Sequence, residues 1–172
     1  MRPPAEPQVI GFDLGKSFAW ARVGHDSMLL ESGASVPAKA DGAVIGIALM
    51  RLVKEMSYLL EYYREQIALV VWESPRFERG RGGKYINEMM GVLRVICETR
   101  EIPYMEVDPS TLKLFATGSG KASKAQMAEA LDEKNPGSHL ALELGEDAVD
   151  AAWVAVWGRE VVLPTLYNGE TP

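Results

Sequence analysis

The chain has little cysteine, little histidine and no long hydrophobic run. Its 172 residues include one cysteine, Cys97, and two widely separated histidines, His25 and His139. A single cysteine cannot form an intramolecular disulfide, and this set of residues lacks the spacing of zinc ligands. We therefore exclude a disulfide framework and a zinc site, and we expect a protein of the reducing cytoplasm.

We also expect neither a membrane-spanning nor a secretory segment. Runs such as residues 67–72 are much too short to span a bilayer, and residues 1–8 contain three prolines and no apolar stretch. A hydrophobic content of 47% and a charged content of 24% are ordinary for a globular domain. We expect a flexible N-terminal tail over residues 1–8, one domain over 9–160, and an open C-terminal tail over 161–172.

Hydrophobic periodicity predicts an α/β fold. A meander of three strands comes first, and strands then alternate with helices. This order implies a mixed five-stranded sheet with helices on its faces. The predicted strands are residues 8–14, 17–23, 28–32, 67–72 and 103–107, and the predicted helices are 43–65, 84–101, 110–116, 123–133 and 144–157.

Four carboxylates occupy unusual positions. Asp13 ends the first strand, Glu73 follows the apolar strand 67–72, and Asp147 and Asp150 lie three residues apart in an otherwise apolar helix. Acids near a helix N-terminus can simply complement the helix dipole. However, sites in open α/β sheets gather at the carboxyl ends of strands, and converging carboxylates need a partner.

The natural partner of four carboxylates is a divalent cation. Mg²⁺ and Mn²⁺ prefer oxygen ligands, and a pair of such ions can activate water and stabilise the leaving oxygen of a phosphodiester. We therefore expect a two-metal site built from the four acids. Glu146, which directly precedes Asp147, is expected to point away from it and to be dispensable.

Basic residues are locally concentrated despite a net charge of −6. Residues 76–84 contain four basic residues and one acid, and residues 111–125 contain three lysines and no acid. A local basic patch is what binding to a phosphate backbone requires. The candidate DNA-binding residues are Arg76, Arg79, Arg81, Lys84, Lys113, Lys121 and Lys124.

Four short motifs follow one another along the chain. They are G-F-D-L-G at residues 11–15, V-W-E at 71–73, T-G-S-G-K-A-S-K-A-Q-M at 117–127 and E-D-A-V-D-A at 146–151. Each motif alone is weakly specific. Together, and in this order and spacing, they resemble the RuvC family of Holliday junction resolvases, including its phage-type relatives.

The resemblance implies an RNase H-like fold and a homodimer. It also implies an endonuclease that requires Mg²⁺ or Mn²⁺ and makes paired symmetric nicks in four-way DNA junctions. Twofold symmetry of the enzyme would suit two symmetric cuts. Carried over by motif position, the metal ligands are Asp13, Glu73, Asp147 and Asp150.

Other roles follow from the same resemblance. Lys124 would be a catalytic residue near the scissile phosphate, and Lys113 would contact DNA. Phe77 would be an aromatic residue that stacks on bases near the crossover, and the helix at 84–101 would form much of the dimer interface.

Several alternatives stay open or are excluded. Gly118–Lys121 is not a P-loop, since position 115 is Phe and Ala122 replaces the required Ser or Thr. The G-x-D-x-G strand also opens sugar kinases and actin-like ATPases, which need two such domains. A broader branched-DNA nuclease, an RNase H-type nuclease and a non-catalytic branched-DNA binder remain as alternative functions.

Overall fold

The structure is a computed structural model that describes residues 6–15, 18–35, 45–74, 81–136 and 140–168. Within these ranges, the side chains of residues 35, 45–48, 81–85 and 140–144 are not described. Among the described residues, no helix is long and apolar enough to cross a membrane.

Five strands form one mixed sheet, as predicted, and their order across it is β3-β2-β1-β4-β5. The strand β1 pairs antiparallel with β2 and parallel with β4, while β2–β3 is antiparallel and β4–β5 is parallel. The central position of β1 and β4 agrees with their continuous apolar sequences. The strands are β1 (Gln8–Leu14), β2 (Phe18–Val23), β3 (Leu29–Ser35), β4 (Ile67–Glu73) and β5 (Tyr104–Val107).

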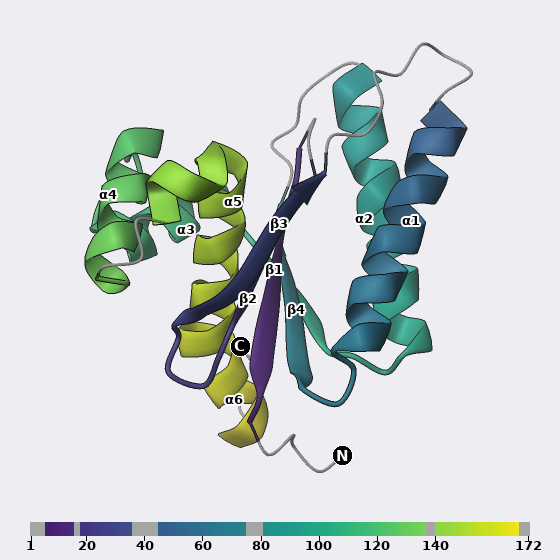
Figure 1. Cartoon of the computed structure of the whole chain (residues 1–172), viewed down its shortest axis with the longest axis horizontal. Helices are drawn as coiled ribbons and strands as arrows, with labels where there is room; N and C mark the ends of the chain where they lie inside the picture. The colour runs from purple at the N-terminus through teal and green to yellow at the C-terminus, as the bar shows by residue number, and fades with distance from the viewer. Residues whose placement is uncertain (1–5, 16–17, 36–44, 75–80, 137–139, 169–172) are drawn as a thin grey trace.

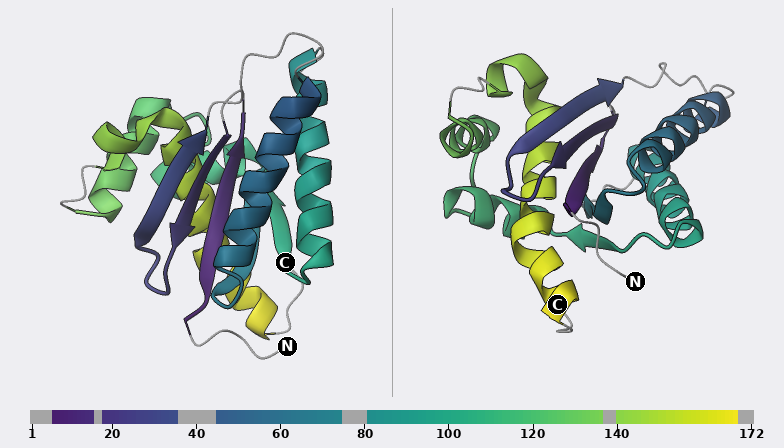
Figure 2. Two further views of the ribbon diagram at one scale, coloured as in Figure 1. Left: turned by 45° about the vertical axis from the view of Figure 1, so that its right-hand side comes forward. Right: turned by 60° about the horizontal axis from the view of Figure 1, so that its bottom comes forward.

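Helices cover both faces of this sheet (Figures 1 and 2). One face packs against α1 (Ile45–Tyr62) and α2 (Arg81–Thr99). The other face packs against α5 (Leu140–Trp157), and α3 (Pro109–Thr117) and α4 (Lys124–Lys134) lie against α5 on its far side. The chain therefore has two hydrophobic cores, one on each side of the sheet.

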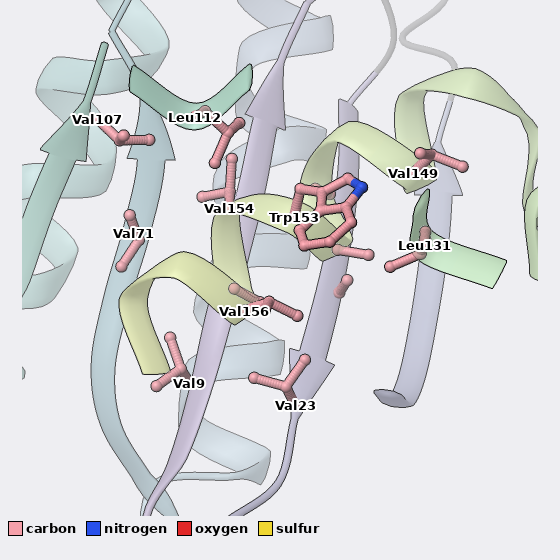
Figure 3. Packing of buried hydrophobic residues seen from close by; sticks show 14 of the residues in the cluster. Val9, Val23, Val71, Val107, Leu112, Leu131, Val149, Trp153, Val154 and Val156 are labelled. Carbon is pink, nitrogen blue, oxygen red and sulfur yellow. The ribbon is translucent and has the colours of Figure 1, made fainter. Parts of the chain in front are cut away.

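Strand alternation decides which side chains meet α5. Val9 on β1 and Val71 on β4 belong to the core under α5, where Figure 3 shows them with Val154. Successive side chains of a strand point to opposite faces, so Asp13 shares the face of Val9 and Glu73 shares the face of Val71. Both strand carboxylates therefore lie on the α5 side of the sheet.

The helix α5 lies unusually close to β1. A Cβ atom added to Gly11 would lie 2.3 Å from the carbonyl oxygen of Ala151 and 2.4 Å from the backbone nitrogen of Ala155. These are backbone atoms of α5, which cannot move without shifting the helix. Only glycine at this position allows the helix that carries Asp147 and Asp150 to lie over the strand that carries Asp13.

The α5 helix begins earlier than predicted. The helix was expected to begin at residue 144, but residues 140–144 form a first helical segment that ends at Gly145, where φ is 72° and ψ is 169°. This left-handed backbone suits glycine and starts a new helical segment at Glu146. The segment 140–144 contains neither glycine nor proline, so nothing in it opposes helix formation.

The predicted tails need correction. The chain does not become an open tail at residue 161, because the π-helix η1 (Gly158–Val162) and α6 (Leu163–Asn168) follow α5. Val162 and Leu163 are buried in the core under α5, which explains why the chain stays attached there. At the other end, Gln8 is already part of β1, and its side chain accepts a hydrogen bond from Arg22.

Candidate active site

The four predicted acids come from three elements and interact with one another. Asp13 is largely buried, and burial, followed by the charges of Asp150, Asp147 and Glu73, raises its pKa to about 7. Asp147 and Asp150 lie one turn apart on α5, so they share one helical face. The site is therefore a set of carboxylates whose negative charges destabilise one another.

These acids do not form a finished metal cage. Among the described residues, no three His, Cys, Asp or Glu side chains are arranged as a group that could hold an ion. Their chemistry nevertheless suits Mg²⁺ or Mn²⁺, because all four offer only oxygen atoms. A cation would also relieve the repulsion that raises the pKa of Asp13. Binding would require the side chains to draw together around the ion.

Lys124 borders the acids at the start of α4. Its ammonium lies 3.6 Å from an oxygen of Asp150 and 3.2 Å from an oxygen of Glu146. Burial lowers the pKa of Lys124, but the hydrogen bond to Glu146 and the charge of Asp150 raise it more, so the group stays charged at neutral pH. Glu146 was expected to point away from Asp147 and to be dispensable; its carboxylate pairs with Lys124, a predicted site residue, and its dispensability stays a prediction.

Local structure fixes the position of Lys124. Ser123 caps α4, and its hydroxyl accepts a hydrogen bond from the backbone N–H of Gln126, whose side chain accepts one from the Ser123 N–H. These two reciprocal hydrogen bonds form a capping box. Because Lys124 is the first residue of α4, the cap determines where its backbone leaves the preceding loop.

Burial also raises the pKa of Asp150, and the nearby charges of Lys124 and Lys113 oppose this shift. Two of the predicted DNA-binding lysines therefore lie beside the acids. Lys121 is exposed in the loop between α3 and α4, and no described contact joins its ammonium to the acids.

The remaining predicted DNA-binding residues cannot be placed at the site. Arg76, Phe77 and Arg79 lie outside the described residues. Arg81 and Lys84 belong to the first turns of α2, but their side chains also lie outside the description.

Sequence reasoning missed the structural role of Gly11. The available signal was its position two residues before Asp13 on the same strand face. Ala151 and Ala155, spaced four residues apart on α5, provide the matching small surface on the helix.

The raised pKa of Asp13 makes a prediction for the metal-free protein. When a carboxyl group has a higher pKa in the folded protein than in the unfolded chain, the folded protein becomes less stable as the pH rises toward the higher value. Between about pH 4 and about pH 7, this group should lower the free energy of unfolding by up to about 1.4 kcal/mol for each pH unit, and the fall should level off above that range. Urea unfolding in EDTA should show this fall in the wild type and not in Asp13→Asn.

A matched control for this experiment is Glu129→Gln, which removes an exposed carboxylate from α4. It should keep the pH dependence of the wild type. If Asp13→Asn and the wild type follow parallel curves, then Asp13 does not carry the proton that its environment implies.

Comparison with known proteins bears on the identity of the chain. No protein-family profile matches it. It is 27% identical over 131 residues to a crossover junction endodeoxyribonuclease RuvC of Prochlorococcus marinus strain MIT 9211, covering 72% of this chain and 78% of that protein. It is 28% identical over 83 residues to the RuvC of strain MIT 9312, covering 48% and 52% of the two chains.

The fold of the chain is similar to that of solved RuvC structures. The RuvC structure of Thermus thermophilus matches with a TM-score of 0.68 at 17% identity, covering 87% of this chain and 91% of that one. The same protein in complex with a Holliday junction substrate matches with a TM-score of 0.68 at 18% identity, covering 87% and 90%. The chain therefore has the RNase H-like fold of the RuvC structures, and its sequence is similar to that of RuvC proteins.

Proposed function

We propose that this chain is a metal-dependent endonuclease that hydrolyses phosphodiesters at four-way DNA junctions with paired symmetric nicks. The observation that carries the proposal is Asp13, a partly buried carboxyl whose pKa is raised by desolvation and by the charges of three further acids. Lysines lie directly beside this acid cluster. Sequence similarity to crossover junction endodeoxyribonucleases supports the same activity.

Each group has a distinct role in the proposed reaction. The four acids would hold two Mg²⁺ or Mn²⁺ ions, which would supply activation of a water molecule and stabilisation of the leaving oxygen. Lys124 is the proposed catalytic cation, since its ammonium can pair with a non-bridging oxygen of the scissile phosphate. Lys113 would hold the DNA backbone beside the acids.

The other basic residues complete the proposed DNA surface. Lys121 is exposed in the loop that leads to α4 and is free to approach a phosphate. The basic segment at residues 76–84 follows closely after Glu73 in the sequence, so its proposed contacts with DNA would lie next to the acids. Its proposed contributors are Arg76, Phe77, Arg79, Arg81 and Lys84.

Two copies of the chain are proposed to act together. A groove of about 490 Å³ runs between α1 and α2, and almost all of its lining is apolar. Val95 at this groove is 63% exposed, and a Cβ atom added to Gly91 would meet nothing within 4 Å. Glycine within a helix costs about 1 kcal/mol relative to alanine, so a close approach by a second helix would explain its presence.

Substitution at the groove tests the dimer. Val95→Glu should convert a dimer into a monomer in sedimentation equilibrium, because it puts a charge into the apolar contact. The unfolding temperature at low protein concentration should change little, since Val95 is exposed in the single chain. Paired nicking should become two independent cuts.

The control is Leu114→Glu, which places the same charge on an exposed leucine of α3. Its mass in solution should equal that of the wild type. A wild-type monomer, or a Val95→Glu protein that remains a dimer, would place the interface elsewhere or remove it.

A substrate panel tests the activity. The wild type should be incubated with Mg²⁺ or Mn²⁺ and a four-way junction, a three-way junction, a flap, a duplex or an RNA/DNA hybrid. Symmetric nicks in opposed strands of the four-way junction support the proposal. Cutting of several branched DNAs would indicate a broader nuclease, cutting of the hybrid an RNase H-type enzyme, and binding without cutting a non-catalytic protein.

The proposed place of action is the reducing cytoplasm. Cys97 is a free, buried thiol, and burial raises its pKa to about 12. A thiol in this environment is unreactive and needs no oxidising compartment.

A further inference from the structure

Glu146 directly precedes the acid pair Asp147 and Asp150 on α5, and it is not one of the four proposed metal ligands. It is the first residue after the break at Gly145, and its side chain is 73% exposed. Its carboxylate oxygen lies 3.2 Å from the Lys124 ammonium. The same ammonium lies 3.6 Å from Asp150, so two carboxylates share one cation.

This sharing creates a conflict within the proposed site. An ammonium close to Asp150 neutralises a carboxylate that is also a proposed metal ligand, and the two cations would compete for it. If Asp150 were the only partner, the ammonium would settle fully on it. Glu146 supplies a second anion at the outer edge of the cluster, which draws the ammonium outward.

The backbone of α4 and the backbone of α5 both contribute to the pairing of Lys124 with Glu146. The capping box fixes the start of α4 at Lys124. The positive φ of Gly145 interrupts α5, so that its second segment starts at Glu146. The two residues therefore lie at the starts of two helical segments whose elements are packed together. The ion pair joins these two helices at the rim of the acid cluster.

We propose that Glu146 is a positioning residue that holds the Lys124 ammonium at the rim of the acid cluster. Held there, the ammonium leaves Asp150 available for a divalent cation and stays beside the path of an arriving phosphate. The inference rests on the proposed function, since it assumes that Asp150 binds a metal ion.

Loss of the Glu146 charge would affect cation binding in two ways. Removing its charge would weaken cation binding directly, through the loss of a nearby anion. It would also weaken binding indirectly, because Lys124 would move onto Asp150. Only the second effect depends on Lys124, so it should vanish when that lysine is absent.

The experiment is a double-mutant cycle read by Mn²⁺ binding. Isothermal titration of the metal-free, full-length protein without DNA gives the dissociation constant of the wild type, Glu146→Gln, Lys124→Met and the double variant. Glu146→Gln should weaken binding about threefold, the size expected of an exposed ion pair, and Lys124→Met should tighten it. In the Lys124→Met background, Glu146→Gln should change the constant by less than about 1.5-fold.

Two further variants sharpen the cycle. Glu146→Asp keeps a carboxylate and should retain most of the wild-type affinity. Glu129→Gln removes an exposed charge from α4 without touching Lys124, and it should leave the affinity unchanged. In single-turnover cutting, Glu146→Gln should be slow at low Mn²⁺ and should approach the wild-type rate at saturating Mn²⁺.

The possible outcomes are distinct. Equal weakening by Glu146→Gln with and without Lys124 would overturn the positioning role and leave only a direct charge effect. No weakening in the wild-type background would show that Glu146 is dispensable. A wild type that binds no Mn²⁺ would overturn the proposed function and, with it, this inference.

Discussion

Asp13→Asn should abolish DNA cutting while junction binding survives. The variant keeps the size of the side chain but removes the carboxylate that is surrounded by the other three acids. A metal contributes several kcal/mol of transition-state stabilisation, so its loss should lower the single-turnover rate by at least about a thousandfold. Junction affinity in a gel-shift assay should change little, since the acids are proposed to bind metal and not DNA.

A matched control is Asp26→Asn, which alters an exposed aspartate in the turn between β2 and β3. It should cut at the wild-type rate. Normal cutting by Asp13→Asn would remove this carboxylate from the site, while loss of both cutting and folding would leave its role to be decided by Asp150→Asn.

Gly11→Ala should disrupt the fold and the site together. The added methyl group would overlap backbone atoms of α5 at 2.3 and 2.4 Å, and no rotamer can relieve this overlap. The helix must move away from β1, at a cost of about 3 kcal/mol or more in the free energy of unfolding. A displacement of about 1 Å of Asp147 and Asp150 relative to Asp13 can lower the rate about a hundredfold.

The control for this prediction is Gly91→Ala on α2, measured at a protein concentration low enough to give single chains, because Gly91 lines the groove of the proposed dimer. An added Cβ there meets nothing within 4 Å, and alanine favours helix by about 1 kcal/mol over glycine, so the variant should be as stable as the wild type or more so. Thermal unfolding followed by circular dichroism compares the two. If Gly11→Ala unfolds at the wild-type temperature, then α5 does not lie as close to β1 as the structure has it.

The sheet could be predicted because its signals are local. The apolar run of residues 67–72 predicted a strand, which the structure confirms as β4 in the interior of the sheet. The resemblance of the four motifs added the RNase H-like fold, which the structural matches bear out. These features depend on the period and order of the residues, and the sequence contains both.

The less predictable features depend on contacts between distant segments. The pairing of Glu146 with Lys124 joins two helices whose spacing only the folded chain defines. The burial of Val162 and Leu163 depends on the core beneath α5, which this part of the sequence does not define by itself. The close approach at Gly11 is likewise a property of the packed pair of β1 and α5.

The most direct test of the central claim, that four acids on three elements form one divalent cation site, is Mn²⁺ binding by the metal-free protein without DNA. The wild type should show saturable binding, and each of four single variants should lose most of it while keeping the wild-type circular dichroism spectrum. Binding that persists unchanged in all four folded variants would contradict the claim. The four variants are Asp13→Asn, Glu73→Gln, Asp147→Asn and Asp150→Asn.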